Sequence, residues 1–75
     1  MRFTPADRDW AAKFAIKVRD RMNELELSQS ECAKRSGVTQ VEISNIVHFK
    51  VVPTIITVKK LSVALCCKPS DLIDF

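Results

Sequence analysis

The sequence predicts an all-α fold of five helices, in a single domain that spans residues 1–75. Apolar residues recur at helical spacings of three and four along most of the chain. Residues that cap helices precede each of these apolar segments. One cluster of β-branched residues, over 51–58, contains Pro53 and continues with helical spacing, so no strand is needed to explain it.

The first helix is expected to be the longest, running from Pro5 to Leu25. Thr4 is a capping residue, and proline suits the first helical position. A single helical face then carries the large apolar residues, which are Trp10, Phe14, Val18, Met22 and Leu25. We expect this face to form part of the core.

Two hydroxyl residues are each followed by glutamate three positions later: Ser28 by Glu31, and Thr39 by Glu42. This is the pattern of a capping box. The hydroxyl accepts from a backbone N–H in the first turn, and the glutamate accepts from the N–H of the capping residue. Two short helices are therefore expected, one after each hydroxyl residue.

These short helices are expected over 29–36 and 40–48, with Gly37 between them. Glycine adopts the left-handed conformation that commonly follows a helix without steric cost. Two short helices joined by a turn that contains glycine form a helix-turn-helix, here over about 28–48.

The last part of the chain predicts two more helices. Pro53 and Thr54 begin a fourth helix that ends near Cys66 and buries Val58, Leu61, Ala64 and Leu65. Lys68 and Pro69 begin a short fifth helix, whose Leu72 and Ile73 are expected to close the core.

The second helix of the helix-turn-helix indicates a function. Five of its residues have side chains that are able to reach base edges in a DNA major groove: Gln40, Val41, Glu42, Ser44 and Asn45. The net charge of +3 suits a polyanionic partner, although charge alone is a weak indication. We therefore expect a regulator that binds double-stranded DNA.

Other classes of function receive little support. The longest uncharged run, 51–58, is too short to span a bilayer. The N-terminus lacks the apolar core of a signal peptide. We therefore expect a cytoplasmic protein with no membrane partner. The single His48 and the absence of tyrosine argue against an enzyme or a small-molecule substrate. The three cysteines include no CxxC, so no metal or other cofactor is expected, and Cys32 and Cys67 are interpreted as buried free thiols.

The chain resembles the lambda-repressor-like family, the XRE and Cro class of helix-turn-helix regulators, over about Val18 to Ile73. The resemblance implies a transcriptional regulator, a repressor of Cro or controller type that binds a pseudo-palindromic operator as a homodimer. The segments that carry it are Leu27-Ser28-Gln29, Ala33, Gly37-Val38-Thr39-Gln40, Ile43-Ser44-Asn45-Ile46, Pro53-Thr54, and Leu61 through Leu72.

The sequence departs from the family at three points. Many members pair a buried arginine with a glutamate, where this chain has Met22 and Val47. Replacing both partners of a buried ion pair by apolar residues is often neutral or stabilising, so the double change supports the alignment. Members usually have glycine where this chain has Phe49 and Cys66, so the chain must turn differently there or accept left-handed strain.

The resemblance also implies roles for individual residues. Gln40 and Val41 would read bases at the start of the recognition helix, and Asn45 and Ser44 would lie one turn later. Glu42 has two possible roles, acceptance from a cytosine or completion of the capping box, and the capping box is favoured. Phosphate contacts are expected from Gln29, Thr39, His48, Lys50 and Lys34.

An apolar run that includes Val51, Val52, Ile55 and Ile56 is too apolar for a solvated loop and predicts a dimer interface. The alternative is that the long first helix covers this run within one chain. A second functional hypothesis is an antitoxin-like protein-interaction module, in which DNA binding is secondary.

Overall fold

The computed structural model describes residues 3–75 and confirms the all-α prediction. Its helices agree with the predicted limits to within two residues. They are α1 (Pro5–Glu24), α2 (Gln29–Ser36), α3 (Gln40–Val47), α4 (Ile55–Ala64) and α5 (Pro69–Ile73).

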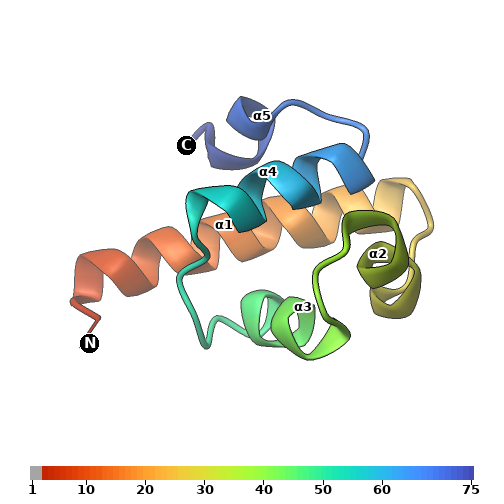
Figure 1. Cartoon of the computed structure of the whole chain (residues 1–75). Helices are drawn as coiled ribbons and strands as arrows, with labels where there is room; N and C mark the ends of the chain where they lie inside the picture. Colours follow the sequence, from red (N-terminus) through yellow and green to blue (C-terminus); the bar gives the residue numbers. More distant parts are fainter. Residues whose placement is uncertain (1–2) are drawn as a thin grey trace.

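The long α1 is central to the arrangement (Figure 1). It packs against α3 and α5, while α4 packs against α2 and α5, and α2 and α3 pack against each other. In this view α2 and α3 lie below α4, and α5 lies above it. No helix within residues 3–75 combines the length and the apolar character needed to cross a bilayer.

The apolar face of α1 supplies the centre of the core, as predicted. Phe14 and Val18 are completely buried, and Met22 is 7% exposed. Trp10 is half-buried and stacks on Phe14 with ring centroids 5.4 Å apart, and Phe75 meets Trp10 edge-on at 5.5 Å. The C-terminal end of the chain is thereby packed against α1.

Two predictions of burial need correction. Ile73 is 38% exposed, whereas Leu72 is buried. Adjacent residues on a helix point about 100° apart, so both cannot face the core from α5, which has five residues. Cys32 is buried as expected, but Cys67 is only half-buried. Burial raises the pKa of both thiols.

The two apolar residues at the family's ion-pair positions lie together. Met22 and Val47 are both buried and line the same hollow between α1 and α3. The neighbouring Arg21 points to α4, which the sequence did not reveal. Its Nε donates to the carbonyl of Leu65 at 2.8 Å and its Nη2 to that of Cys66 at 3.1 Å, so α1 caps the C-terminus of α4.

Three helices end with a non-glycine residue in the left-handed conformation: Glu26 (φ 54°), Phe49 (φ 63°) and Cys66 (φ 55°). The strain expected at Phe49 and Cys66 is therefore accepted, and Glu26 adds a third such position. At the end of α1, the N–H of Leu27 donates to the carbonyl of Met22 at 2.9 Å, which is a Schellman bond.

Replacing Glu26 by glycine should raise the free energy of unfolding by about 0.5–1 kcal/mol, because glycine removes the left-handed strain but is more flexible when unfolded. Glu26 is an exposed residue, so little packing is lost. Urea denaturation measures the change. Glu26→Ala is the matched control, because it keeps the Cβ and the strain. A glycine variant no more stable than the alanine variant would contradict the strain.

Candidate nucleic-acid interface

The first helix of the helix-turn-helix begins with the predicted capping box. Ser28 Oγ accepts from the N–H of Glu31 at 3.1 Å, and Glu31 Oε1 accepts from the N–H of Ser28 at 3.2 Å. The bond from the backbone of Ser28 holds the pKa of Glu31 below its ordinary value. This box fixes where α2 begins.

The turn between α2 and α3 is closed by local hydrogen bonds. Gly37 adopts φ 77°, as its position predicted, and donates to the carbonyl of Ala33 at 2.9 Å. Ser36 Oγ accepts from the N–H of Val38 at 3.1 Å, and the Val38 side chain is buried. The buried Val38 and the closed turn hold α3 against α2.

The second predicted capping box is only half formed. Thr39 Oγ1 accepts from the N–H of Glu42 at 3.1 Å, as expected. The carboxylate of Glu42 does not return to Thr39, because its Oε1 accepts from Thr57 Oγ1 on α4 at 3.2 Å. The favoured interpretation of Glu42 was therefore wrong. The sequence pattern could not reveal a competing partner fifteen residues away.

The outer face of α3 brings most of the predicted base-reading residues together. They line an open hollow with a residue from the start of α2, and we call it the recognition hollow: Gln29, Gln40, Val41, Ser44 and Asn45. Val41 is 72% exposed. Glu42 is not part of this hollow, since its carboxylate is bonded to α4.

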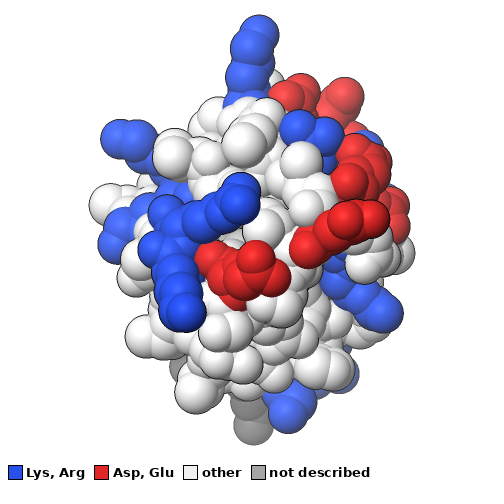
Figure 2. Space-filling model, turned by 90° about the vertical axis from the view of Figure 1, so that its right-hand side faces the viewer, with Lys and Arg blue, Asp and Glu red and all other residues white. Residues whose placement is uncertain are grey.

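The recognition hollow is uncharged, because amide, hydroxyl and aliphatic side chains line it. In Figure 2 the acidic side chains lie in the upper and middle parts of the view. The lower part is mostly white, with basic side chains at its right and lower edges.

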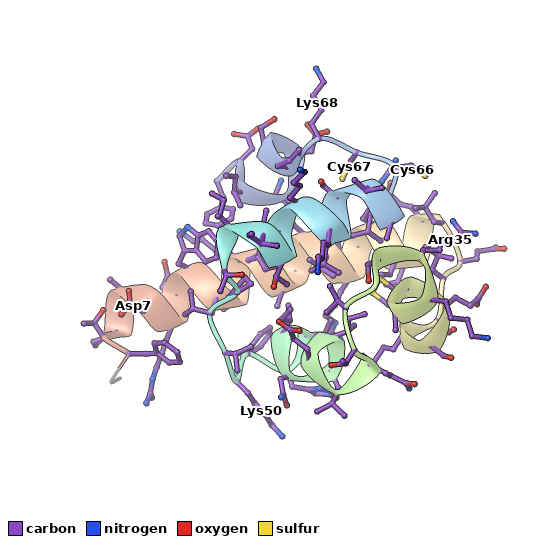
Figure 3. All side chains as sticks on the ribbon, viewed as in Figure 1. Asp7, Arg35, Lys50, Cys66, Cys67 and Lys68 are labelled. Carbon is purple, nitrogen blue, oxygen red and sulfur yellow. The ribbon has the colours of Figure 1, made fainter. Side chains whose placement is uncertain are left out.

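The two predicted phosphate-contact residues after α3, His48 and Lys50, differ in how available they are to a phosphate. His48 Nδ1 lies 2.7 Å from the carbonyl oxygen of Ser44, and since a carbonyl only accepts, Nδ1 is the donor. A neutral His48 then offers only an acceptor nitrogen to a phosphate. Lys50 is exposed, and its side chain extends away from the protein on the side where α3 lies (Figure 3).

Lys34 is exposed on the last turn of α2 and is not among the residues that line the recognition hollow. A basic residue that sequence reasoning missed lies closer: exposed Arg19 of α1 lines a hollow with Asn23, Gln29 and His48. Gln29 belongs to both hollows. No local pattern marks Arg19, because α1 and α2 approach each other only in the folded chain.

The predicted dimer run divides among three environments. Val51 is half-buried and packs against the core. Val52 and Ile55 line what we call the apolar hollow, with Ala6, Asp7, Trp10, Pro53, Val58 and Ile73. Ile56 lines a different one, the basic hollow, with Arg35, Ser36, Lys59, Lys60 and Val63. The first helix therefore does not cover the whole run, because Ile55 is 81% exposed and Ile56 60%, whereas Val51 and Val52 are half-buried.

The closed turn, the short α2 and the outward face of α3 define a helix-turn-helix protein. The HTH_3 family, described as helix-turn-helix, matches the chain over residues 18–72. The protein belongs to this family, the XRE class of DNA-binding transcriptional regulators.

Two solved structures share the fold. An HTH_3 family transcriptional regulator from Vibrio cholerae is 22% identical, with a TM-score of 0.86 over 91% of this chain and 38% of that one. This chain thus spans well under half of that protein's length. The restriction-modification controller protein C.AhdI from Aeromonas hydrophila is 24% identical, with a TM-score of 0.79 over 83% of this chain and 94% of that one. A comparison with curated proteins finds no match.

Proposed function

We propose that the protein binds a pseudo-palindromic DNA operator as a homodimer and acts as a repressor of Cro or controller type. The observation that carries this proposal is the recognition hollow, where uncharged hydrogen-bonding side chains surround an exposed Val41 at the start of α3. The likeness to a controller protein of nearly the same length supports the controller type.

The residues of the hollow suit direct readout in the major groove. Gln40 can bond an adenine in bidentate fashion, and Val41 can contact a thymine methyl group. Asn45 and Ser44, one turn later, can bond a second base or a phosphate. Gln29 lies beside Gln40 in the hollow and can orient its amide. We assign the choice of base sequence to these hydrogen-bonding and aliphatic side chains, because no charged side chain lines the described part of the hollow.

Phosphate contacts are assigned to the border of this surface. Lys50 and Arg19 supply positive charge on two sides of the helix-turn-helix. Thr39 Oγ1 accepts from a backbone N–H, so its own proton remains free for a phosphate. Nδ1 of His48 already donates to the carbonyl of Ser44 and is not available to a phosphate, and Lys34 contributes from the last turn of α2.

Gln40→Ala and Lys50→Ala should weaken DNA binding in different ways. Gln40→Ala should cost about 1–3 kcal/mol on the operator and leave binding to a scrambled duplex unchanged. Lys50→Ala should weaken binding to both duplexes alike. It should also reduce by about one the slope of the logarithm of the binding constant against the logarithm of the salt concentration. Titrations of both duplexes at several salt concentrations measure these effects, and each variant is the control for the other. Equal losses on both duplexes for Gln40→Ala would remove it from base readout.

The dimer contact is assigned to Ile55 and Val52 at the apolar hollow. Among the residues that the structure describes, Asp7 alone brings a charge to this hollow, so two copies could meet there without repulsion between clustered charges. The basic hollow around Ile56 fits a two-fold axis poorly, because Arg35, Lys59 and Lys60 of both copies would meet. A two-fold dimer would need its recognition helices about 34 Å apart, one turn of DNA.

Ile55→Asp should make operator binding much more dependent on protein concentration, because it places a charge in the proposed contact. Sedimentation should show a shift toward monomer, with the helical circular dichroism signal unchanged. Val63→Asp is the matched control, because Val63 is also exposed on α4, at 69% against 81% for Ile55, but lies in the basic hollow. A wild-type protein that stays monomeric at high concentration and binds the operator one-to-one would contradict the dimer.

The basic hollow favours a second candidate function, binding of a protein partner. Ile56 and Val63 lie two turns apart on one stripe of α4 and are 60% and 69% exposed, with Lys59 and Lys60 between them and Arg35 across on α2. This pattern suits an acidic amphipathic helix, whose apolar stripe would cover α4 while its carboxylates meet the cations. A phosphate backbone would leave both apolar side chains unburied.

A synthetic acidic peptide tests this candidate. An amphipathic helix with leucines seven residues apart and glutamates between them should bind, and a scrambled peptide of the same charge should bind much more weakly. Val63→Asp should abolish peptide binding and spare DNA binding. Equal binding of the two peptides would show that only net charge is sensed and would remove the candidate.

A further inference from the structure

One side-chain hydrogen bond joins the start of the recognition helix to α4. Glu42 Oε1 accepts from Thr57 Oγ1 at 3.2 Å, and Thr57 is only 7% exposed. The main packing partners of α3 are α1 and α2, while those of α4 are α2 and α5. The bond therefore links two helices that are held mainly by other neighbours.

The same bond belongs to a chain of hydroxyl groups at the start of α4. Thr54 caps this helix, with Thr54 Oγ1 accepting from the N–H of Thr57 at 3.3 Å. The two hydroxyl oxygens lie 3.2 Å apart. Because a carboxylate accepts, the Thr57 proton is directed to Glu42, and Thr57 Oγ1 remains free to accept from Thr54. The cap of α4 and the carboxylate of α3 thus form one connected unit.

We infer that Glu42 is a positioning residue: through Thr57 it fixes the orientation of the first turn of α3, which presents Gln40 and Val41. The inference rests on the proposed function and specifies how its recognition surface is held. Ile55, the proposed dimer contact, lies within the same first turn of α4 as Thr57. The bond therefore connects the turn that carries the dimer contact with the turn that reads bases.

Direct base readout by Glu42 would require its carboxylate to leave a buried hydroxyl and turn outward. The two roles predict different relations between Glu42 and Thr57. A positioning role needs both partners, so removal of either should have the same effect and removal of both should add nothing. A base-reading role needs Glu42 alone.

The experiment uses a duplex selected by the wild-type protein from a randomised pool. Glu42→Ala and Thr57→Val should each weaken binding to it by about five- to ten-fold, and the double variant should be no weaker than either. Glu42→Gln should stay close to wild type, because its amide oxygen still accepts from Thr57. Each variant should select the same base sequence from the randomised pool as the wild-type protein does. Affinity for a scrambled duplex controls for loss of folded protein.

A second measurement needs no DNA. Thr57→Val should speed amide hydrogen exchange at Ile43 and Ser44 in the free protein. Ser62→Ala is the matched control, because this buried hydroxyl donates to Lys59 within α4 and has no bond to α3. Additive losses on the duplex, or a changed base preference for Glu42→Ala alone, would overturn the inference and leave the proposed function standing. If the wild type selects no duplex, the proposed function fails. Unchanged amide hydrogen exchange at Ile43 and Ser44 in Thr57→Val would refute the positioning role of Glu42 independently of that result.

Discussion

Burial of one face of α3 is the constraint on which the rest of the surface depends. A helix of eight residues is not stable alone in water. This one persists because Ile43, Ile46 and Val47 are buried beside the apolar face of α1 and α2. The same burial decides which side of the helix faces solvent, so the core contacts of α1 also set the orientation of the recognition hollow.

The residues that we propose to read bases and the clustered basic residues line different hollows of this molecule. Within residues 3–75 no charged residue lines the recognition hollow, whereas Arg35, Lys59 and Lys60 line a different hollow. Lys50 follows α3, and Arg19 lines a hollow with Gln29 of α2, so each brings positive charge near the helix-turn-helix. Non-specific attraction to DNA scales with the phosphates that are neutralised, so the proposed binding to an operator would depend more on base contacts and on pairing of two copies.

The sequence predicted the fold well because its main determinants are local. Caps at Thr4 and Ser28, the single glycine at position 37 and the apolar spacing along α1 each act within one or two turns. The contacts that it could not predict are long-range. Arg21 reaches carbonyl groups more than forty residues away, and Glu42 exchanges its expected local bond for Thr57. Of the site residues, the recognition hollow gathers those predicted from the start of α3. Arg19 lines a neighbouring hollow that shares Gln29, and tertiary packing alone brings it there.

The most direct test of the central claim is an NMR titration of the isotope-labelled protein with a duplex that it selects. The account predicts that the largest amide shift changes fall on Gln29, on Gln40 through Asn45 and on Lys50, with little change along the Ile56 to Val63 stripe of α4. Changes concentrated on that stripe, with α3 unaffected, would contradict a recognition surface built on α3.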